Sequence, residues 1–295
     1  MKRVTVALLC ALLSIAAGRA DDWEGNLTFS TEDVAAFNAC MQSLQTAAKP
    51  SVGDATLAVA RHFVGRPYVA ATLEKEPERL VVNLREWDCT TLVESAVALA
   101  RTACGGAPSF TTYLHELSRL RYRTDTVRDY TDRLHYFTDW IYENARRGLV
   151  RDVTREIGGR PYRPQLSFMS THPDRYAALR SHPWRVAFMR DKETEISARA
   201  GYAVLPTASI PAASTSLRDG DIVCFVTSIS GLDISHVGII CRRGRTVTFV
   251  HASSAAGRVI IEPTSLHAYA ARNKRTVGVM IVRPIPPHAP GRSDR

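Results

Sequence analysis

The sequence predicts an α+β fold in which helices come first and an antiparallel sheet follows. Over much of the first two-thirds of the chain, apolar residues recur at helical spacing, most clearly in residues 89–104. The last third instead has short β-branched and aromatic runs separated by tight turns such as Gly231-Leu232-Asp233. Segregation of helices and strands is typical of α+β proteins. We therefore expect N-terminal helices packed on an antiparallel β-meander.

The 295-residue chain begins with a segment typical of a secretory signal peptide. A basic start, Met1-Lys2-Arg3, precedes an apolar run over residues 4–17 and the small-residue end Gly18-Arg19-Ala20. The apolar run is too short to form a stable membrane anchor. We expect residues 1–20 to be removed and the protein to be exported to a bacterial periplasm or secreted.

Charge and motif content exclude several classes of partner. Loss of Lys2, Arg3 and Arg19 would leave 35 of the 38 basic residues against 29 acidic ones, and the excess is scattered along the chain. Without a dense basic patch that contains aromatic residues, nucleic acid is a poor candidate partner. No CxxC or HExxH spacing is present, so we predict no metal and no cofactor. We expect a monomer of one domain over residues 21–284, and a solvated, basic, Pro-rich tail over 285–295.

The helical part of the chain divides at glycine and proline signals. Gly65-Arg66-Pro67-Tyr68 is predicted to be a loop, and Cys104-Gly105-Gly106 to end a helix. Apolar spacing predicts helices over residues 31–48, 53–63, 89–104 and 110–121, one that ends at Gly148, and one over 186–200.

The strand-rich part predicts consecutive antiparallel strands. Apolar runs bounded by turns give strands over residues 222–226, 236–241, 246–251, 259–262 and 277–282. We expect a large helical insertion, at about 105–215, between Cys89 and His236. We expect part of that insertion to form a lobe that faces a substrate.

Cys89 is the candidate nucleophile. Asp88 before it is a suitable N-cap, so Cys89 would lie in the first turn of a helix, where free N–H groups and the helix dipole favour a thiolate. The alternative is a buried structural thiol. Removal of the signal segment leaves five cysteines, and an odd number leaves at least one of them outside an intramolecular disulfide. Pairing of Cys224 with Cys241, and of Cys40 with Cys104, stays open.

Two histidines supply the candidate base and its partner. His236 begins one predicted strand and His251 ends the next, so antiparallel pairing would bring both to the same edge of the sheet. A thiol at a helix end packed there would have His236 as its base and His251 to hold the His236 ring. Each histidine taken alone is more often a surface or structural residue.

These residues together resemble the NlpC superfamily of bacterial cell-wall cysteine hydrolases, which have a papain-like fold. Within it, the chain is similar to an N-acetylmuramoyl-L-alanine amidase branch first catalogued as a domain of unknown function. The motifs that carry the resemblance are Gly65-Arg66-Pro67-Tyr68, Asp88-Cys89-Thr90-Thr91-Leu92-Val93-Glu94, Arg133-Leu134-His135-Tyr136, Phe168-Met169-Ser170, Gly231-Leu232-Asp233-Ile234-Ser235-His236, His251-Ala252-Ser253 and Leu266-His267-Ala268-Tyr269.

The resemblance implies a papain-like amidase domain with the triad Cys89, His236 and His251. It further implies cleavage, in a muropeptide or peptidoglycan fragment, of the amide that joins N-acetylmuramic acid to L-alanine. Tyr68 would lie over the thiol. In relatives that cut the stem peptide, the residues equivalent to Asp88 and Ser235 bind a free amine, a role that an amidase does not need.

The remaining substrate-side candidates are His135 and Tyr136, which would line the glycan side of the cleft. Two alternatives stay open: a γ-D-glutamyl-diamino acid endopeptidase with the same triad, and a non-catalytic wall-binding protein.

Overall fold

The computed structural model describes residues 26–45, 51–124 and 127–287, which form a mixed structure of helices and an antiparallel sheet. The predicted signal peptide and the end of the predicted tail, from residue 288, lie outside the described residues. No helix among the described residues is long and apolar enough to cross a membrane. The helices are α1 (Thr31–Gln45), α2 (Val52–His62), α3 (Cys89–Cys104), α4 (Phe110–Arg121), α5 (Phe137–Arg146), α6 (Phe168–Thr171), α7 (Ala177–Arg180), α8 (Pro183–Ala198), α9 (Ile210–Ala213) and α10 (Leu266–Arg272).

The main sheet contains a meander, as predicted, but its last strand returns to the other side of that meander. Strands β6, β7, β8 and β9 pair in chain order, whereas β10 pairs with β6. Helix α10, between β9 and β10, carries the chain back across the sheet. The strands are β1 (Leu27–Thr28), β2 (Leu80–Val81), β3 (Val150–Asp152), β4 (Arg160–Pro161), β5 (Ala203–Pro206), β6 (Ile222–Thr227), β7 (Ile234–Arg243), β8 (Thr246–Ser253), β9 (Arg258–Ile261) and β10 (Thr276–Pro284).

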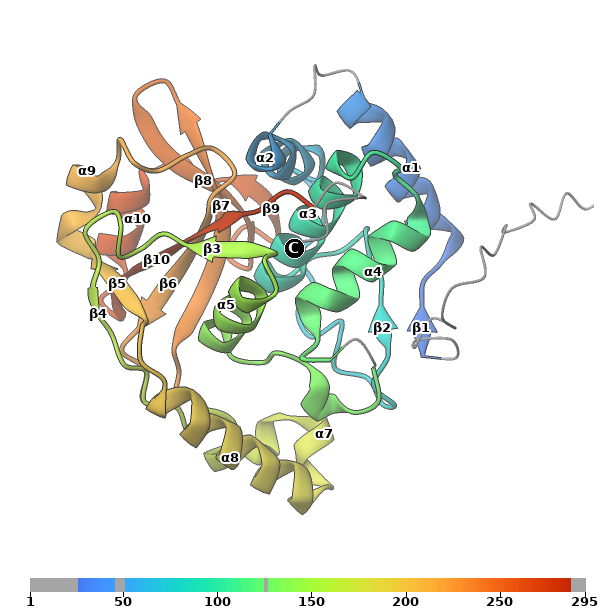
Figure 1. Ribbon diagram of the computed structural model, residues 1–295, viewed down its shortest axis with the longest axis vertical. Coiled ribbons are helices and arrows are strands. Elements are labelled where there is room, and N and C mark those ends of the chain that lie inside the picture. The colour runs from blue at the N-terminus through green and yellow to red at the C-terminus, as the bar shows by residue number, and fades with distance from the viewer. Residues whose placement is uncertain (1–25, 46–50, 125–126, 288–295) are drawn as a thin grey trace, which may run out of the picture.

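The segment between Cys89 and His236 is less purely helical than predicted. Its strands β3 and β5 both pair with β10, and β4 pairs with β5, so part of this segment extends the main sheet. Residues 168–171 form the short helix α6. Helices α6 and α7 both contact α8, and α7 and α8 lie together at the bottom of Figure 1.

Helix α3 lies at the centre of the molecule, between the other N-terminal helices and the sheet (Figure 1). It contacts α2 and α4 on one side and β7 and β8 on the other. Every residue from Thr91 to Thr102 is buried. A helix that is surrounded on all sides in this way cannot slide or rotate without opening the core.

A buried ion pair supports α3 from within. Arg121 of α4 donates through Nε to Oε2 of Glu94 at 2.7 Å, and both side chains are 2% exposed. Arg121 also donates to the carbonyl of Val81. Loss of either charged partner would leave the other buried and uncompensated, which is strongly destabilising.

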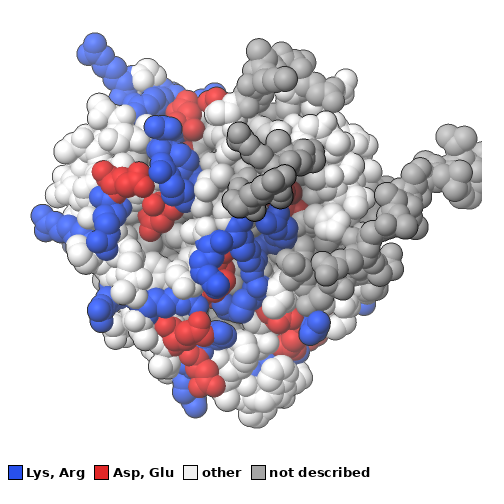
Figure 2. Space-filling model, in the orientation of Figure 1, with Lys and Arg blue, Asp and Glu red and all other residues white. Residues whose placement is uncertain are grey.

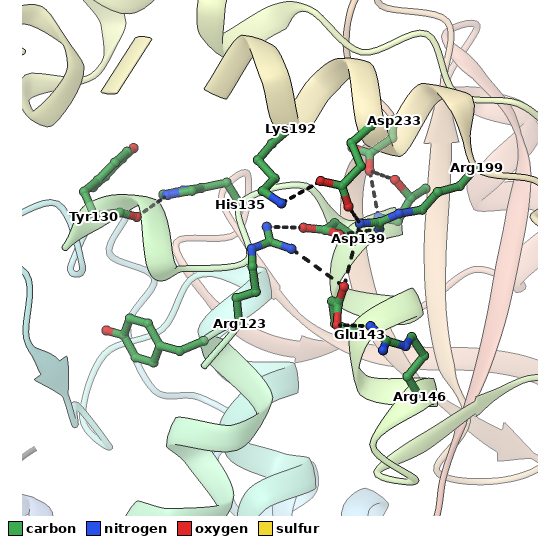
Figure 3. A network of polar contacts seen from close by, with 12 residues as sticks. Arg123, Tyr130, His135, Asp139, Glu143, Arg146, Lys192, Arg199 and Asp233 are labelled. Carbon is green, nitrogen blue, oxygen red and sulfur yellow. Dashed lines mark hydrogen bonds and ion pairs between the residues drawn. The ribbon is translucent and has the colours of Figure 1, made fainter. Parts of the chain in front are cut away.

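A second polar network joins α5 to α8 and to the sheet (Figure 3). Asp139, which is 1% exposed, accepts from Arg123 and Arg199, each at 2.5 Å. Asp233 accepts from the backbone N–H and the hydroxyl of Thr138 at 2.7 and 2.8 Å. Asp233 therefore caps α5 while it stands directly before β7.

The charges on the face shown in Figure 2 lie in several groups, most of them with basic side chains beside acidic ones. This pattern fits the scattered basic excess of the sequence. Neither disulfide left open by the sequence is formed, since Cys40, Cys224 and Cys241 are free thiols. Cys224 pairs in the sheet with Val237, four residues before Cys241, which puts the two thiols about 13 Å apart along the strand.

We predict that Asp233→Ala lowers the free energy of unfolding by about 2–4 kcal/mol, because it leaves buried donors of Thr138 and Ile234 without an acceptor. Urea unfolding measures the change. Asp191→Ala, which removes an exposed carboxylate on α8, is the control and is expected to change stability by less than about 0.5 kcal/mol. Equal effects of both variants would contradict the capping role.

Candidate active site

The two candidate histidines are hydrogen-bonded to each other. Nε2 of His236 on β7 lies 2.7 Å from Nδ1 of His251 on β8. The sheet brings them together because Ile239 pairs with Val250, so the start of β7 lies beside the end of β8. This is the juxtaposition expected from antiparallel pairing.

A β-bulge sets the direction of His236. On β6, Val226 pairs with Ile234 and Phe225 pairs with His236, so Ser235 is the extra residue. Bulges of this kind turn side chains and are frequent next to active sites. Ser235 is exposed, and its hydroxyl lies 3.5 Å from the carbonyl of Phe225, a long distance for a hydrogen bond. Its clearest contribution is thus the bulge itself.

Gly238 makes room for the second histidine. A Cβ at this position would lie 2.6 Å from the Phe249 ring and 3.3 Å from Cβ of His251. Any larger residue would push the ring or the histidine away. The glycine two residues after His236 is therefore required by the close approach of β8.

Cys89 is the first residue of α3, and its sulfur lies near the backbone of Val237, the residue after His236. Asp88 is the N-cap, as predicted: its Oδ1 accepts from the Thr91 N–H at 2.8 Å. Tyr68 is held alongside by backbone hydrogen bonds of its neighbours, from the Trp87 N–H to the Pro67 carbonyl and from the Val69 N–H to the Trp87 carbonyl.

The surroundings of Cys89 favour a neutral thiol rather than the predicted thiolate. Burial and the negative charge of Asp88 raise the pKa of Cys89 to about 11, against the smaller opposite effects of Val237 and Thr90. Burial and His251 lower the pKa of His236 to about 3. Burial lowers the pKa of His251 to about 4. In all three groups desolvation is the largest cause of the shift, and it favours the uncharged thiol and the uncharged imidazoles near neutral pH.

Aromatic rings enclose the histidine pair. The Tyr269 ring of α10 lies 6.2 Å from the His236 ring and 5.7 Å from the His251 ring, measured between centroids. Phe225 and Phe249 pack on the other sides, at 5.9 Å from His236 and 4.7 Å from His251. These rings pack against both imidazoles and contribute to the burial that lowers their pKa values.

Sequence reasoning missed one residue of this cluster, Glu262. Its Oε2 lies 3.5 Å from Nε2 of His251, and both side chains are at most 5% exposed. The sequence does contain a signal for this residue, because Glu262 directly follows the apolar run Val259-Ile260-Ile261. That run pairs with the strand that carries His251.

A cavity of about 220 Å³ lies at the start of α3, and its lining includes neither Cys89 nor Tyr68, His236 or His251. Asp88 and Thr90, on either side of the cysteine, line it, and so do His135 and Tyr136. The wall also contains Ala71, Leu73, Glu74, Thr91, Glu94, Tyr130, Arg133, Leu134, Met169, Tyr176 and Leu232. The α6–α7 region thus contributes Met169 and Tyr176 to a pocket formed mainly around the start of α3.

Most polar atoms of His135 and Tyr136 already form hydrogen bonds within the protein. Nε2 of His135 lies 2.8 Å from the Tyr130 carbonyl, and burial with Arg133 holds its pKa well below the usual range. Hence Nε2 carries the proton and Nδ1 is the acceptor. Tyr136 donates to Oε1 of Glu193 at 2.6 Å and accepts from the Met169 N–H, so it offers the pocket its ring.

Among the described residues, no group of three or more His, Cys, Asp or Glu side chains is arranged to hold a metal ion. The prediction of no metal and no cofactor stays a prediction.

Residues 58–279 match a family model described as AmiA-like, N-acetylmuramoyl-L-alanine amidase-like. The chain belongs to this family. Membership places it among amidase-like peptidoglycan hydrolases, which act on the cell wall outside the cytoplasm.

Several solved structures are similar to this chain, and their descriptions differ. An N-acetylmuramoyl-L-alanine amidase from Bacteroides uniformis ATCC 8492 is 35% identical, with a TM-score of 0.75 over 79% of this chain and 98% of that one. A Bacteroides fragilis protein, described provisionally as a xylanase, is 35% identical, with a TM-score of 0.73 over 77% and 99%. A Legionella pneumophila protein of the family DUF1460 is 19% identical, with a TM-score of 0.65 over 86% and 95%, and shares the fold. No curated protein matches the chain.

We predict that the rate at which iodoacetamide alkylates Cys89 rises with pH toward about 11, without a plateau near neutrality. The raised pKa leaves little thiolate at pH 7, and the thiolate is the reactive form. Mass spectrometry of the Cys89 peptide measures the rate, with Cys89→Ala to identify it. A rate that is already maximal below pH 7 would contradict a neutral thiol.

Proposed function

We propose that this protein is an exported cysteine amidase that cleaves the bond between N-acetylmuramic acid and L-alanine in muropeptides. Cys89, His236 and His251 would form the triad on a papain-like core of the NlpC superfamily. The observation that carries the proposal is the position of Cys89, on the first turn of a buried helix beside β7, next to two hydrogen-bonded histidines.

The reaction begins with two neutral groups. Because Nε2 of His236 is bonded to His251, Nδ1 is the nitrogen left to accept the thiol proton. As that proton moves, the sulfur attacks the lactyl carbonyl and a tetrahedral intermediate forms. His236 then gives the proton to the L-alanine nitrogen, the C–N bond breaks, and the stem peptide leaves with a free amine.

Water completes the cycle. His236 takes a proton from water, whose oxygen attacks the thioester, and the C–S bond breaks to leave a lactyl carboxylic acid and the regenerated thiol. The helix start supports the negative charge on the intermediate: the N–H of Cys89, at the first helical position, has no acceptor within the helix. Tyr68 would stand on the other side of the carbonyl.

The cavity beside Asp88 is the natural place for the muramic acid. Aromatic side chains, chiefly Tyr130, Tyr136 and Tyr176, line it, and Nδ1 of His135 can accept a hydrogen bond. Because the scissile nitrogen belongs to L-alanine, Asp88 has no free amine to bind, and its helix cap explains its presence.

The pocket fits a glycosidase poorly. Glycoside hydrolysis needs a pair of available carboxyl groups, one on each side of the bond. The carboxylates of this pocket are engaged: Glu94 with Arg121, Glu74 with Arg133, and Asp88 with the start of α3. This argues for amide chemistry rather than the xylanase activity attributed to the Bacteroides fragilis protein.

We predict that the wild type converts a muramyl-tetrapeptide into a free sugar acid and an intact tetrapeptide, and that Cys89→Ala lowers turnover by at least about a thousandfold. Mass spectrometry of the products measures both. Cys104→Ala, which removes the other partly exposed cysteine among the described residues, is the control and should stay within about twofold of the wild type.

The product masses separate the alternatives. A sugar that still carries L-Ala-D-Glu would identify a γ-D-glutamyl-diamino acid endopeptidase instead. Full activity in Cys89→Ala would remove the nucleophile from the mechanism. Binding of the substrate without any product would favour a wall-binding protein.

A further inference from the structure

We propose that Glu262 is a positioning residue that fixes the proton positions on both site histidines. The inference rests on the function proposed above, in which His236 is the base for Cys89. Glu262 touches neither the thiol nor, on this geometry, the substrate, and it would act through His251.

The sheet register directs Glu262 toward His251. On β9, Ile260 pairs directly with His251, and the side chain two residues later lies on the same face as its diagonal neighbour. The backbone N–H of Glu262 donates to the Phe249 carbonyl at 2.9 Å, which keeps this residue in register just past the end of β9. Its carboxylate therefore arrives behind the His251 ring, on the side away from His236.

The two carboxylate oxygens of Glu262 have different partners. Oε1 accepts from the backbone N–H and the hydroxyl of Thr264, at 3.2 and 2.6 Å. Oε2 is the oxygen that faces Nε2 of His251 at 3.5 Å. Within the described residues that nitrogen is buried and has no hydrogen-bond partner at shorter range. A distance of 3.5 Å is long for a hydrogen bond, and catalytic contacts often shorten when substrate binds.

The proton order follows from the chemistry of the acceptors. A carboxylate can only accept, so the Nε2 that faces it carries the His251 proton. Nδ1 of His251 is then unprotonated and must accept from Nε2–H of His236. With its proton on Nε2, His236 has a lone pair at Nδ1, the atom that the thiol needs. Reversal of the His251 tautomer would reverse the His236 tautomer and leave no base at Nδ1.

The charged and titratable groups around this pair are few. His251 is faced by His236 from β7, by Glu262 beyond β9 and by the Tyr269 ring from α10. Of these, Glu262 supplies the negative charge, and it raises the pKa of His236 against the larger effect of burial. The same carboxylate thus orders the protons and favours transfer of the thiol proton to His236.

The test uses E262Q, which keeps the shape and can keep the Thr264 contacts but removes the charge. We expect kcat on the muramyl-tetrapeptide to fall by about tenfold or more, while KM stays within about twofold because Glu262 does not bind the substrate. T264V is the matched control. It removes the hydroxyl from Oε1 and leaves Oε2 facing His251, so kcat should stay within about twofold of the wild type.

A second readout does not depend on the amidase activity. Long-range ¹H–¹⁵N NMR at pH 7 should show both histidines of the wild type protonated at Nε2 and not at Nδ1. In E262Q, His251 should carry a substantial share of its proton on Nδ1.

The outcomes are separable. If the wild type leaves the muramyl-tetrapeptide intact but shows the expected tautomers, which change in E262Q, the amidase proposal fails and the tautomer assignment for Glu262 stands. If wild-type His251 is protonated at Nδ1, or if E262Q has wild-type tautomers, the Glu262 proposal is overturned whatever the activity. A loss of kcat in T264V equal to that in E262Q would mean that Glu262 acts only as a support for its turn, and would also overturn it.

Discussion

The burial of α3 is the constraint on which the rest of the structure depends. From Thr91 to Thr102 the helix is enclosed by α2, α4 and the sheet, and its one internal carboxylate, Glu94, is neutralised by Arg121. Such a helix has one stable depth in the core. That depth sets where its first residue emerges, beside Val237, and the side chain at that point is Cys89. The position of the thiol is thus a consequence of packing rather than of local loop structure.

Three features of the sheet place His236 and His251 beside the start of α3. Asp233 joins the start of β7 to the start of α5, the bulge at Ser235 turns His236, and Gly238 lets β8 bring His251 close. All three residues lie within ten positions of His236 in the sequence, and each acts through a direct steric or hydrogen-bonding contact. The segment 233–238 therefore contains a helix-capping aspartate, a bulge residue and a glycine, because it must hold the His236 imidazole between the start of α3 and strand β8.

Local patterns predicted what depends on local physics. The apolar stripe and end signals gave α3 and α4 their observed bounds, and alternating turns gave β6 to β9 in order. The sequence pattern did not predict that β10 returns to pair with β6, or that β5 pairs with β10. The paired residues of β5 and β10 are more than 60 positions apart in the sequence. Hydrophobic periodicity does not encode pairing between such distant segments. Residue type and strand order sufficed to predict that His236 and His251 lie together. Glu262 was missed because its relevance arises from register.

The sequence could not indicate the burial that opposes the predicted thiolate, for a related reason: a helix start can be read from the sequence, whereas desolvation depends on the three-dimensional surroundings. Two carboxylates now shape the site from opposite ends. Asp88, next to the sulfur, favours the neutral thiol, while Glu262, behind His251, favours a protonated His236. One opposes thiolate formation and the other promotes proton transfer. In the proposed mechanism the negative charge would pass from the sulfur to the substrate oxygen during attack, so the repulsion from Asp88 would fall while the attraction of Glu262 for the imidazolium would persist. On that mechanism the arrangement would favour a thiol that loses its proton only when a carbonyl is present to take the charge.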